Sequence, residues 1–254
     1  MCLDCGCLDG SDRHGTQGHI TLKRLQKAAD ASGLPLGEVA WNIPRTLAAG
    51  QDGPGSPLAN RPAVIFDCDG ILAFTAESLC TALNAKFGTT YSPQGQTFFP
   101  GTFLPHKLPG EQSGWLADQI RLPAFAAACA PDFHALDCLR DAWDAGFTVS
   151  VVTERAPELQ DVTTAWLADW GAPPVPVHAV GHGQKPAYLA ARYGPGYPAV
   201  LIDDNPVAGI TIARPGIEVW QPRRSYTPTV ARDHVRIFAG WPQVRGWLGL
   251  GPQA

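Results

Sequence analysis

Long apolar runs are missing from this sequence of 254 residues, and charged residues are scarce. No run reaches the roughly 18–20 apolar residues that a membrane-spanning helix requires. Charged residues make up 17% of the chain and the net charge is −4, which argues against a broad electrostatic surface for duplex nucleic acid. The N-terminus shows neither the basic start nor the apolar segment of a secretory signal. These absences predict a soluble, cytoplasmic protein without a membrane partner.

Cysteine is too unevenly placed for a secreted disulfide framework. The chain has seven cysteines, an odd number, and three of them fall within the first seven residues. This distribution is typical of a protein from a reducing compartment. The others lie in apolar or helical contexts, where we expect small buried side chains; they are Cys68, Cys80, Cys129 and Cys138.

A separate metal site is predicted at the N-terminus, where soft ligands are dense: Cys2, Cys5, Cys7, His14 and His19. Zn²⁺ usually takes four Cys or His ligands in a tetrahedral array. So short a segment, rich in Gly and Asp, needs a metal in order to fold. We therefore expect the three cysteines and one histidine to bind structural zinc. The alternatives are a frayed terminus with incidental cysteines and a redox role.

The chain divides into an N-terminal helical module, a linker, a larger α/β domain and a helical tail. The linker is rich in Gly, Pro and Ser, as flexible connections are. After it, β-branched runs alternate with helical patterns, which predicts a parallel sheet with crossover helices. A stretch dense in Gly, Pro and Phe interrupts this alternation and predicts a small inserted cap. The expected boundaries are 1–49, 50–61, 62–222 and 223–254, with the cap at about 75–132.

Hydrophobic patterning gives the expected elements. Five buried strands are predicted at 63–67, 147–152, 177–180, 199–202 and 217–220. Helices of the α/β domain are predicted at 77–87, 133–145, 157–170 and 186–193. The N-terminal module should hold helices at 21–32 and 35–47, and the tail an amphipathic helix at 230–238.

Polar residues gather where three of the expected strands end. They are Asp67 and Asp69 after the first strand, Thr153 and Arg155 after the second, Lys185 at a helix start, and Asp203 and Asp204 after the fourth. Ligands of open parallel sheets collect at this edge. Four carboxylates there would repel one another unless a cation lay among them. Mg²⁺ prefers such oxygen ligands, so the pattern predicts a magnesium-dependent phosphate site.

The first two carboxylates have distinct chemical uses at such a site. Asp67 can act as a nucleophile and form an aspartyl-phosphate. Asp69, two residues on, is within reach to exchange protons with the leaving group and with water. Read alone, each motif has an ordinary interpretation as a turn, a strand end, a helix cap or a solvated lysine. Four such elements in this order, each at a strand end or helix start, are hard to explain by chance.

The segment Val64-Ile-Phe-Asp-Cys-Asp-Gly-Ile-Leu72 resembles motif one of the haloacid dehalogenase (HAD) superfamily of phosphohydrolases. Thr153 matches its motif two, Lys185 its motif three, and Asp203-Asp204 its motif four. The resemblance covers about residues 62–222 and implies a Rossmann-like core. One departure is Ile71, where the superfamily usually has Thr or Val; Ile is β-branched like both and should preserve the turn.

The resemblance also implies roles for these residues. Asp67 would be the nucleophile and Asp69 the general acid and base, while Thr153 and Lys185 would bind the phosphoryl oxygens. Mg²⁺ would be held by the Asp67 carboxylate, the Asp69 backbone carbonyl and either Asp203 or Asp204. An Asp at the second acidic position favours a phosphatase over a dehalogenase, which needs no acid there.

The sequence resembles two groups within the superfamily closely enough to name them. The 5′(3′)-deoxyribonucleotidases share the Asp-x-Asp-Gly-Ile-Leu-Ala start and a cap of this size. The 3′-phosphatase domain of phage-type polynucleotide kinases is similar through Val151–Arg155 and Ile202–Pro206, which makes Arg155 a candidate contact to a phosphate or a nucleic-acid backbone. The acidic net charge favours a small substrate over a polynucleotide, whose binding needs many Lys and Arg contacts.

Three functions follow from these patterns. The first is a Mg²⁺-dependent phosphatase acting on a nucleotide or a similar small ester. The second is a 3′-phosphatase that processes nucleic-acid ends with help from the N-terminal module. The third is a binding protein with a catalytically silent HAD-like core. Because every residue needed for the chemistry is present, the first two are favoured.

Overall fold

The computed structural model describes residues 22–32, 62–93, 97–99, 102–104, 108–193, 198–224 and 232–251. The chain separates into two compact units, Met1–Asn60 and Arg61–Ala254. None of the helices in the described ranges is long and apolar enough to span a membrane.

Helix α1 (Leu22–Ser32) is the described part of the first unit, and it confirms the helix expected at 21–32. Leu25 and Ala29, four residues apart and so on one face of the helix, are both buried. The linker and the helix expected at 35–47 lie outside the described residues. The same holds for the predicted zinc ligands, Cys2, Cys5, Cys7, His14 and His19, so zinc binding stays a prediction from the sequence.

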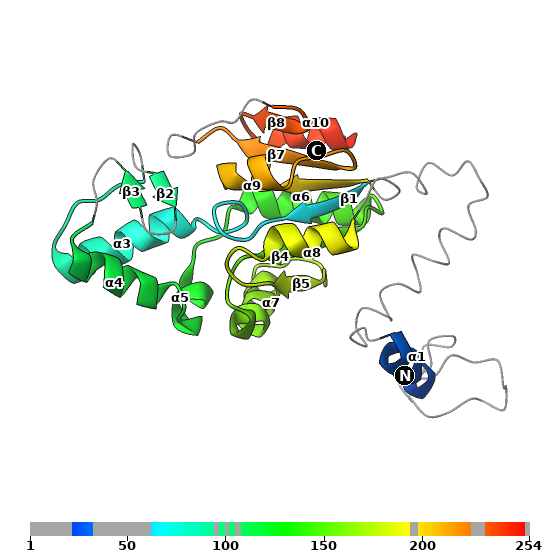
Figure 1. Cartoon of the computed structure of the whole chain (residues 1–254), viewed down its shortest axis with the longest axis horizontal. Coiled ribbons are helices and arrows are strands. Elements are labelled where there is room, and N and C mark those ends of the chain that lie inside the picture. Colours follow the sequence, from blue (N-terminus) through cyan, green and yellow to red (C-terminus); the bar gives the residue numbers. More distant parts are fainter. Residues whose placement is uncertain are drawn as a thin grey trace. The chain divides into compact units, whose positions relative to one another are not determined.

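The second unit is built on a six-stranded parallel sheet, which confirms the predicted α/β class (Figure 1). The strands lie in the order β5-β4-β1-β6-β7-β8. Their bounds are β1 Ala63–Phe66, β4 Val149–Thr153, β5 Val177–Ala179, β6 Ala199–Ile202, β7 Ile217–Pro222 and β8 Val235–Phe238. Strand β1 pairs with β4 on one side and β6 on the other, so it occupies the centre of the sheet.

The prediction of a helix at 230–238 is wrong. Residues 235–238 instead form β8, which pairs in parallel with β7 through contacts such as Trp220 with Arg236. In the segment Val-Arg-Ile-Phe the exposed Arg236 lies between the half-buried Val235 and Ile237, and this pattern suits an edge strand. The tail does contain a helix, α10 (Trp241–Leu248), which packs against α6 (Phe133–Asp144).

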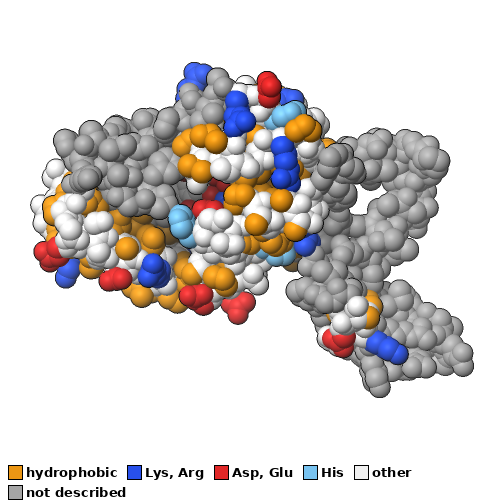
Figure 2. Space-filling view, viewed as in Figure 1, with side chains coloured by type: hydrophobic (Ala, Val, Ile, Leu, Met, Phe, Trp, Pro, Cys, Tyr) orange, Lys and Arg blue, Asp and Glu red, His pale blue; other side chains and the backbone are white. Residues whose placement is uncertain are grey.

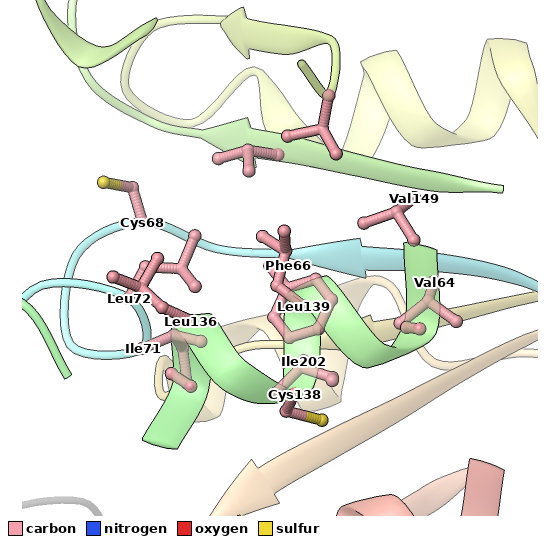
Figure 3. Close-up of a cluster of buried hydrophobic side chains, with 14 of the residues drawn as sticks. Val64, Phe66, Cys68, Ile71, Leu72, Leu136, Cys138, Leu139, Val149 and Ile202 are labelled. Carbon is pink, nitrogen blue, oxygen red and sulfur yellow. The ribbon is translucent and has the colours of Figure 1, made fainter. Parts of the chain in front are cut away.

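Helices cover both faces of the sheet, so alternate residues of one strand pack into two different hydrophobic clusters. In β1, Val64 and Phe66 belong to one hydrophobic cluster, whereas Ala63 and Ile65 belong to the other. Figure 3 shows Phe66 beside Leu139 of α6. The first cluster contains residues of α6, α7 (Gln160–Asp169) and α10, and the second contains residues of α8 (Lys185–Arg192) and α9 (Pro206–Thr211). Burial on both faces explains the continuous apolar runs.

The segment inserted between β1 and β4 forms a separate lobe beside the sheet (Figure 1). It contains α3 (Thr75–Phe87), the antiparallel strands β2 (Thr97–Phe99) and β3 (Thr102–Leu104), α4 (Gly110–Gln119) and α5 (Pro123–Ala128). The rings of Phe87 and Trp115 meet edge to face at 5.6 Å and join α3 to α4. The Tyr91 hydroxyl donates to Gln112 Oε1 at 2.9 Å. This lobe therefore has packing contacts of its own.

Candidate active site

The sequence-predicted polar residues come from neighbouring strands of one sheet edge. Asp67 directly follows β1, Thr153 ends β4, and Asp203 directly follows β6. Phe66 at the end of β1 is in register with Val151 of β4 and Ile202 of β6, so the three strands end side by side. Figure 2 shows acidic side chains in a recess between the lobe of α3–α5 and the sheet.

A tight turn after β1 sets the direction of the first acidic motif. The carbonyl of Cys68 accepts hydrogen bonds from the backbone N–H groups of Leu72 and Ala73, both at 2.9 Å. The side chains of Ile71 and Leu72 are fully buried and anchor this turn in the core. The side chain of Ile71, expected from the sequence to preserve the turn, packs in the core beneath it.

Three carboxylates and one ammonium group form the centre of the site. Oxygen atoms of Asp67, Asp203 and Asp204 all lie within 4.8 Å of one another. Lys185 Nζ is 3.0 Å from Asp67 Oδ1 and 2.7 Å from Asp203 Oδ2. The Lys185 side chain is only 3% exposed, so its charge is balanced by these carboxylates and not by water. One positive charge against three negative charges leaves an excess of negative charge in a buried place.

The two adjacent carboxylates after β6 have different surroundings. Each oxygen of Asp203 accepts one hydrogen bond: Lys185 Nζ donates to Oδ2 at 2.7 Å, and the backbone N–H of Asn205 donates to Oδ1 at 2.8 Å. The Asp204 carboxylate receives no hydrogen bond from the described part of the chain. It lies instead against Gly70, where a Cβ atom would be 2.0 Å from Asp204 Oδ2.

Burial and mutual repulsion change how these groups titrate. Burial raises the pKa of Asp67 well above its ordinary value, although the charge of Lys185 opposes the shift. Burial, together with the negative charge of Asp203, raises the pKa of Asp204 to about 7. The pKa of Lys185 is raised despite its burial, because Asp203 and Asp67 stabilise the ammonium form. The cluster therefore favours a bound positive charge.

The donor set fits a hard divalent cation. Oxygen atoms of three carboxylates lie within 4.8 Å of one another, and the Asp204 carboxylate accepts no hydrogen bond from the described residues. Such oxygen-only donors suit Mg²⁺, which binds through one or two carboxylates and keeps other positions for water or phosphate. A cation here would also relieve the repulsion that raises the pKa of Asp67 and of Asp204.

The second acidic residue of the motif lies in a different network. Arg155 Nη2 donates to Asp69 Oδ1 at 2.7 Å, and Arg155 Nε donates to Asp69 Oδ2 at 2.9 Å. The Thr75 hydroxyl donates to Asp69 Oδ1 at 2.6 Å. Burial alone would raise the pKa of Asp69, but the charge and hydrogen bonds of Arg155 hold it below its ordinary value. Asp69 is thus a positioned carboxylate outside the three-carboxylate cluster.

Thr153 is completely buried at the end of β4. Its hydroxyl oxygen accepts a hydrogen bond from the backbone N–H of Arg155 at 3.3 Å. The hydroxyl proton remains available to donate, since a hydroxyl group both accepts and donates.

Three contacts of the site were missed in the sequence analysis. They are the hydrogen bond of Thr75 to Asp69, the hydrogen bond between Thr163 and Arg155, and the close approach of the Asp204 carboxylate to Gly70. Gly70 belonged to the motif, but nothing in its position says which carboxylate approaches it. The two threonines follow their partners by six and eight residues across turns, and no simple spacing rule connects such positions.

Comparison with known proteins gives matches in fold. No protein-family model and no curated protein matches the sequence. A HAD family hydrolase from Deinococcus radiodurans R1, solved with bound phosphate and sodium, is 16% identical with a TM-score of 0.51, and the match covers 77% of this chain and 100% of that one. A predicted phosphoglycolate phosphatase from Haemophilus somnus 129PT is 13% identical with a TM-score of 0.50, covering 76% and 99%.

A dehalogenase matches to the same degree, with 10% identity, a TM-score of 0.50, and coverage of 76% of this chain and 99% of that one. At such identities the likeness concerns the fold and leaves the substrate open. The α/β core with an inserted lobe is the fold of HAD-type hydrolases.

Proposed function

We propose that this protein is a Mg²⁺-dependent phosphatase that hydrolyses a phosphate monoester through an aspartyl-phosphate on Asp67. The observation that carries the proposal is the cluster of Asp67, Asp203 and Asp204 around buried Lys185 at the carboxyl edge of the sheet. The fold shared with HAD-type hydrolases, one of them solved with bound phosphate, supports the same reaction class.

The residues that would hold Mg²⁺ are the Asp67 and Asp204 carboxylates and the Asp69 backbone carbonyl. Asp204 is the better ligand of the adjacent pair because its carboxylate receives no hydrogen bond from the described residues, whereas each oxygen of Asp203 already accepts one. Asp203 would instead hold Lys185 in place. When bound, the ion neutralises the carboxylates and the negative charge of the substrate phosphate, which otherwise repel each other.

The reaction needs two displacements at phosphorus. A carboxylate oxygen of Asp67 attacks the phosphorus, and the bond to the ester oxygen breaks. Asp69 gives that oxygen a proton, which it holds while the substrate is bound because the negative charge of the phosphate raises the pKa of Asp69 against the effect of Arg155. Asp69 then takes a proton from a water molecule that attacks the phosphorus of the aspartyl-phosphate. This second step releases inorganic phosphate and restores the Asp67 carboxylate.

The ammonium group of Lys185 and the hydroxyl group of Thr153 would bind the phosphoryl oxygens. The Lys185 ammonium has three donors, and its contacts to Asp67 and Asp203 leave one for the substrate. The free proton of the Thr153 hydroxyl is the second candidate donor. Both groups belong to rigid elements, α8 and β4, which suits the placement of a transition state.

The substrate we propose is a nucleotide or a similar small ester. This choice depends on the sequence resemblance to the deoxyribonucleotidases and on the net charge of −4, which offers few contacts to a long phosphate chain. The second candidate is a polynucleotide 3′-phosphatase, for which Arg155 would contact the nucleic acid. Arg155 already donates to Asp69 and Thr163, so fewer of its donors remain for such a contact.

Inorganic phosphate release across a substrate panel tests the proposal. The panel holds 5′- and 3′-mononucleotides, sugar phosphates and a 3′-phosphorylated oligonucleotide, each with Mg²⁺ and with EDTA. We expect Mg²⁺-dependent release that is faster on mononucleotides than on the oligonucleotide. The reverse ranking would favour end processing of nucleic acid. No release above the background of Asp67→Asn would contradict the phosphatase and favour a silent binding protein.

A further inference from the structure

Asp69 has an asymmetric hydrogen-bond environment. Its Oδ1 atom accepts from Arg155 Nη2 at 2.7 Å, from Arg155 Nε at 3.2 Å, and from the Thr75 hydroxyl at 2.6 Å. Its Oδ2 atom accepts only from Arg155 Nε, at 2.9 Å, among the described residues. A carboxylate oxygen accepts about two hydrogen bonds well. Oδ1 is therefore saturated, whereas Oδ2 keeps an open position.

The Arg155 guanidinium is itself held by a hydrogen bond to a buried side chain. Its Nη1 atom donates to the Thr163 hydroxyl at 3.1 Å, and that hydroxyl donates in turn to the backbone carbonyl of Leu159 at 2.8 Å. Thr163 is fully buried in α7. The guanidinium is thus held at two of its nitrogens on Asp69 and at the third on Thr163.

Exposure separates the two partners of this ion pair. The Arg155 side chain is 5% exposed, while 34% of the Asp69 side chain is exposed. The carboxylate is thus the exposed side of the pair, and the three guanidinium nitrogens of Arg155 already donate to Asp69 and Thr163, which leaves few donors for an incoming substrate. A planar, bidentate arginine is well suited to orienting a carboxylate, because it fixes the plane of the group as well as its position.

We propose that Arg155 and Thr75 are positioning residues that hold Oδ1 of Asp69 and leave Oδ2 as the oxygen that exchanges the proton with the leaving group and with water. The inference rests on the proposed phosphatase activity. It reassigns Arg155, expected from the sequence to contact the substrate, to a contact with the general acid. Thr75 at the start of α3 also ties this carboxylate to the first helix of the cap.

Leaving groups of different basicity separate this role from the alternatives. A phenolate leaving group needs a proton as the ester bond breaks, whereas 2,4-dinitrophenolate is stable without one. Loss of a positioned acid should therefore slow the first substrate far more than the second. Loss of a phosphate contact should slow both by a similar factor, because their transferred groups are identical. A substitution that only disturbs the fold should also lower kcat/KM for both substrates by the same factor.

The experiment measures kcat/KM for phenyl phosphate and 2,4-dinitrophenyl phosphate with Mg²⁺. For Arg155→Ala we expect a loss on the order of 10–100-fold on phenyl phosphate, part of the 10²–10⁴ that a positioned acid contributes, and less than about threefold on the dinitrophenyl ester. Thr75→Val should show the same selectivity with a smaller loss, and Thr75→Ser, which keeps the hydroxyl, should lose less than Thr75→Val. Arg140→Ala removes an arginine that pairs with Asp137 on α6 and should leave the ratio of the two rates unchanged.

Equal losses on both substrates in Arg155→Ala and Thr75→Val would overturn the proposal. If Arg155→Ala does not fold, Thr75→Val decides alone, since it removes one hydrogen bond to Oδ1 and leaves the ion pair. A wild-type protein that hydrolyses neither ester with Mg²⁺ would contradict the proposed function itself. That outcome is distinct from a wild type that is active and variants that lose both rates equally.

Discussion

The Asp204 carboxylate occupies the space that a side chain at position 70 would need. A Cβ atom on Gly70 would lie 2.0 Å from Asp204 Oδ2 and 2.4 Å from Asp204 Cγ. The backbone of Gly70 also has a φ of +75°, which residues with a side chain rarely adopt. Glycine in the first motif therefore lets a carboxylate from the fourth motif enter the cluster.

Gly70→Ala should consequently damage the cation site more than the fold. The left-handed backbone costs on the order of 1–2 kcal/mol for alanine. The larger effect is displacement of Asp204, because its backbone is held by the end of β6 and only the side chain can move. We expect a loss of Mg²⁺ affinity and of phosphate release by about 100-fold, measured by calorimetry and by steady-state kinetics.

Gly88→Ala is the matched control for that variant. Gly88 has a similar φ of +65°, but its added Cβ would meet nothing within 4 Å. It should lower the free energy of unfolding by about 1 kcal/mol and leave Mg²⁺ affinity as it is. Similar Mg²⁺ affinities in the two variants would refute the contact with Asp204 as the reason for glycine.

The adjacent carboxylates should respond differently to the same substitution. Asp204→Asn removes the charge of the proposed ligand and should weaken Mg²⁺ binding directly. Asp203→Asn removes the charge that holds Lys185, an indirect change of the kind that costs about 10–100-fold in metal affinity or activity. We expect Asp204→Asn to raise the Mg²⁺ concentration for half-maximal activity far more than Asp203→Asn does. The opposite order would make Asp203 the direct ligand.

Binding of Mg²⁺ should depend on pH near neutrality. The pKa of Asp204 is raised to about 7, so the carboxyl is half protonated at that pH in the absence of metal. Since Mg²⁺ binds the ionised form, binding releases a proton, and affinity should rise with pH up to and slightly above 7. Calorimetry in buffers of different ionisation enthalpy measures this proton release. Asp204→Asn should release fewer protons; the same release from both proteins would contradict the assignment.

Lys185 should stabilise the fold as well as the site. Its ammonium group is buried between Asp67 and Asp203, and Lys185→Met leaves these carboxylates facing each other. Breaking a buried ion pair by removing one partner costs about 3–5 kcal/mol. We expect a loss of that order in urea unfolding with EDTA at pH 7.5. The double variant Lys185→Met, Asp203→Asn should recover part of it; no recovery would argue against repulsion as the cause.

Much of the sheet and the three-carboxylate cluster could be predicted from the sequence. Strands such as 199–202 are continuous apolar runs bounded by turns, and a strand buried on both faces has that pattern. The rule that ligands collect where parallel strands end places Asp67 and Asp203 at one edge of the sheet. The pairing of β1 with β6, which makes the two residues neighbours, comes from the structure.

Other features depend on contacts that no local pattern records. Strand β8 is only four residues long, and its apolar positions also fit one face of a helix; pairing with β7 decides the outcome. The partner of Arg155 could not be predicted either, because phosphate and carboxylate are equally good partners for a guanidinium. Zinc binding by Cys2, Cys5, Cys7 and a histidine stays a prediction, and elemental analysis of the purified protein can test it.

Trapping the covalent intermediate tests the central claim most directly. Borohydride reduces an aspartyl-phosphate to homoserine, which mass spectrometry locates in a peptide. Protein quenched during turnover with Mg²⁺ and a phosphate ester should carry homoserine at position 67, and protein quenched without substrate or with EDTA should not. Mg²⁺-dependent phosphate release that continues in Asp67→Asn, with no homoserine at position 67 in the wild type, would contradict the role of Asp67 as the nucleophile.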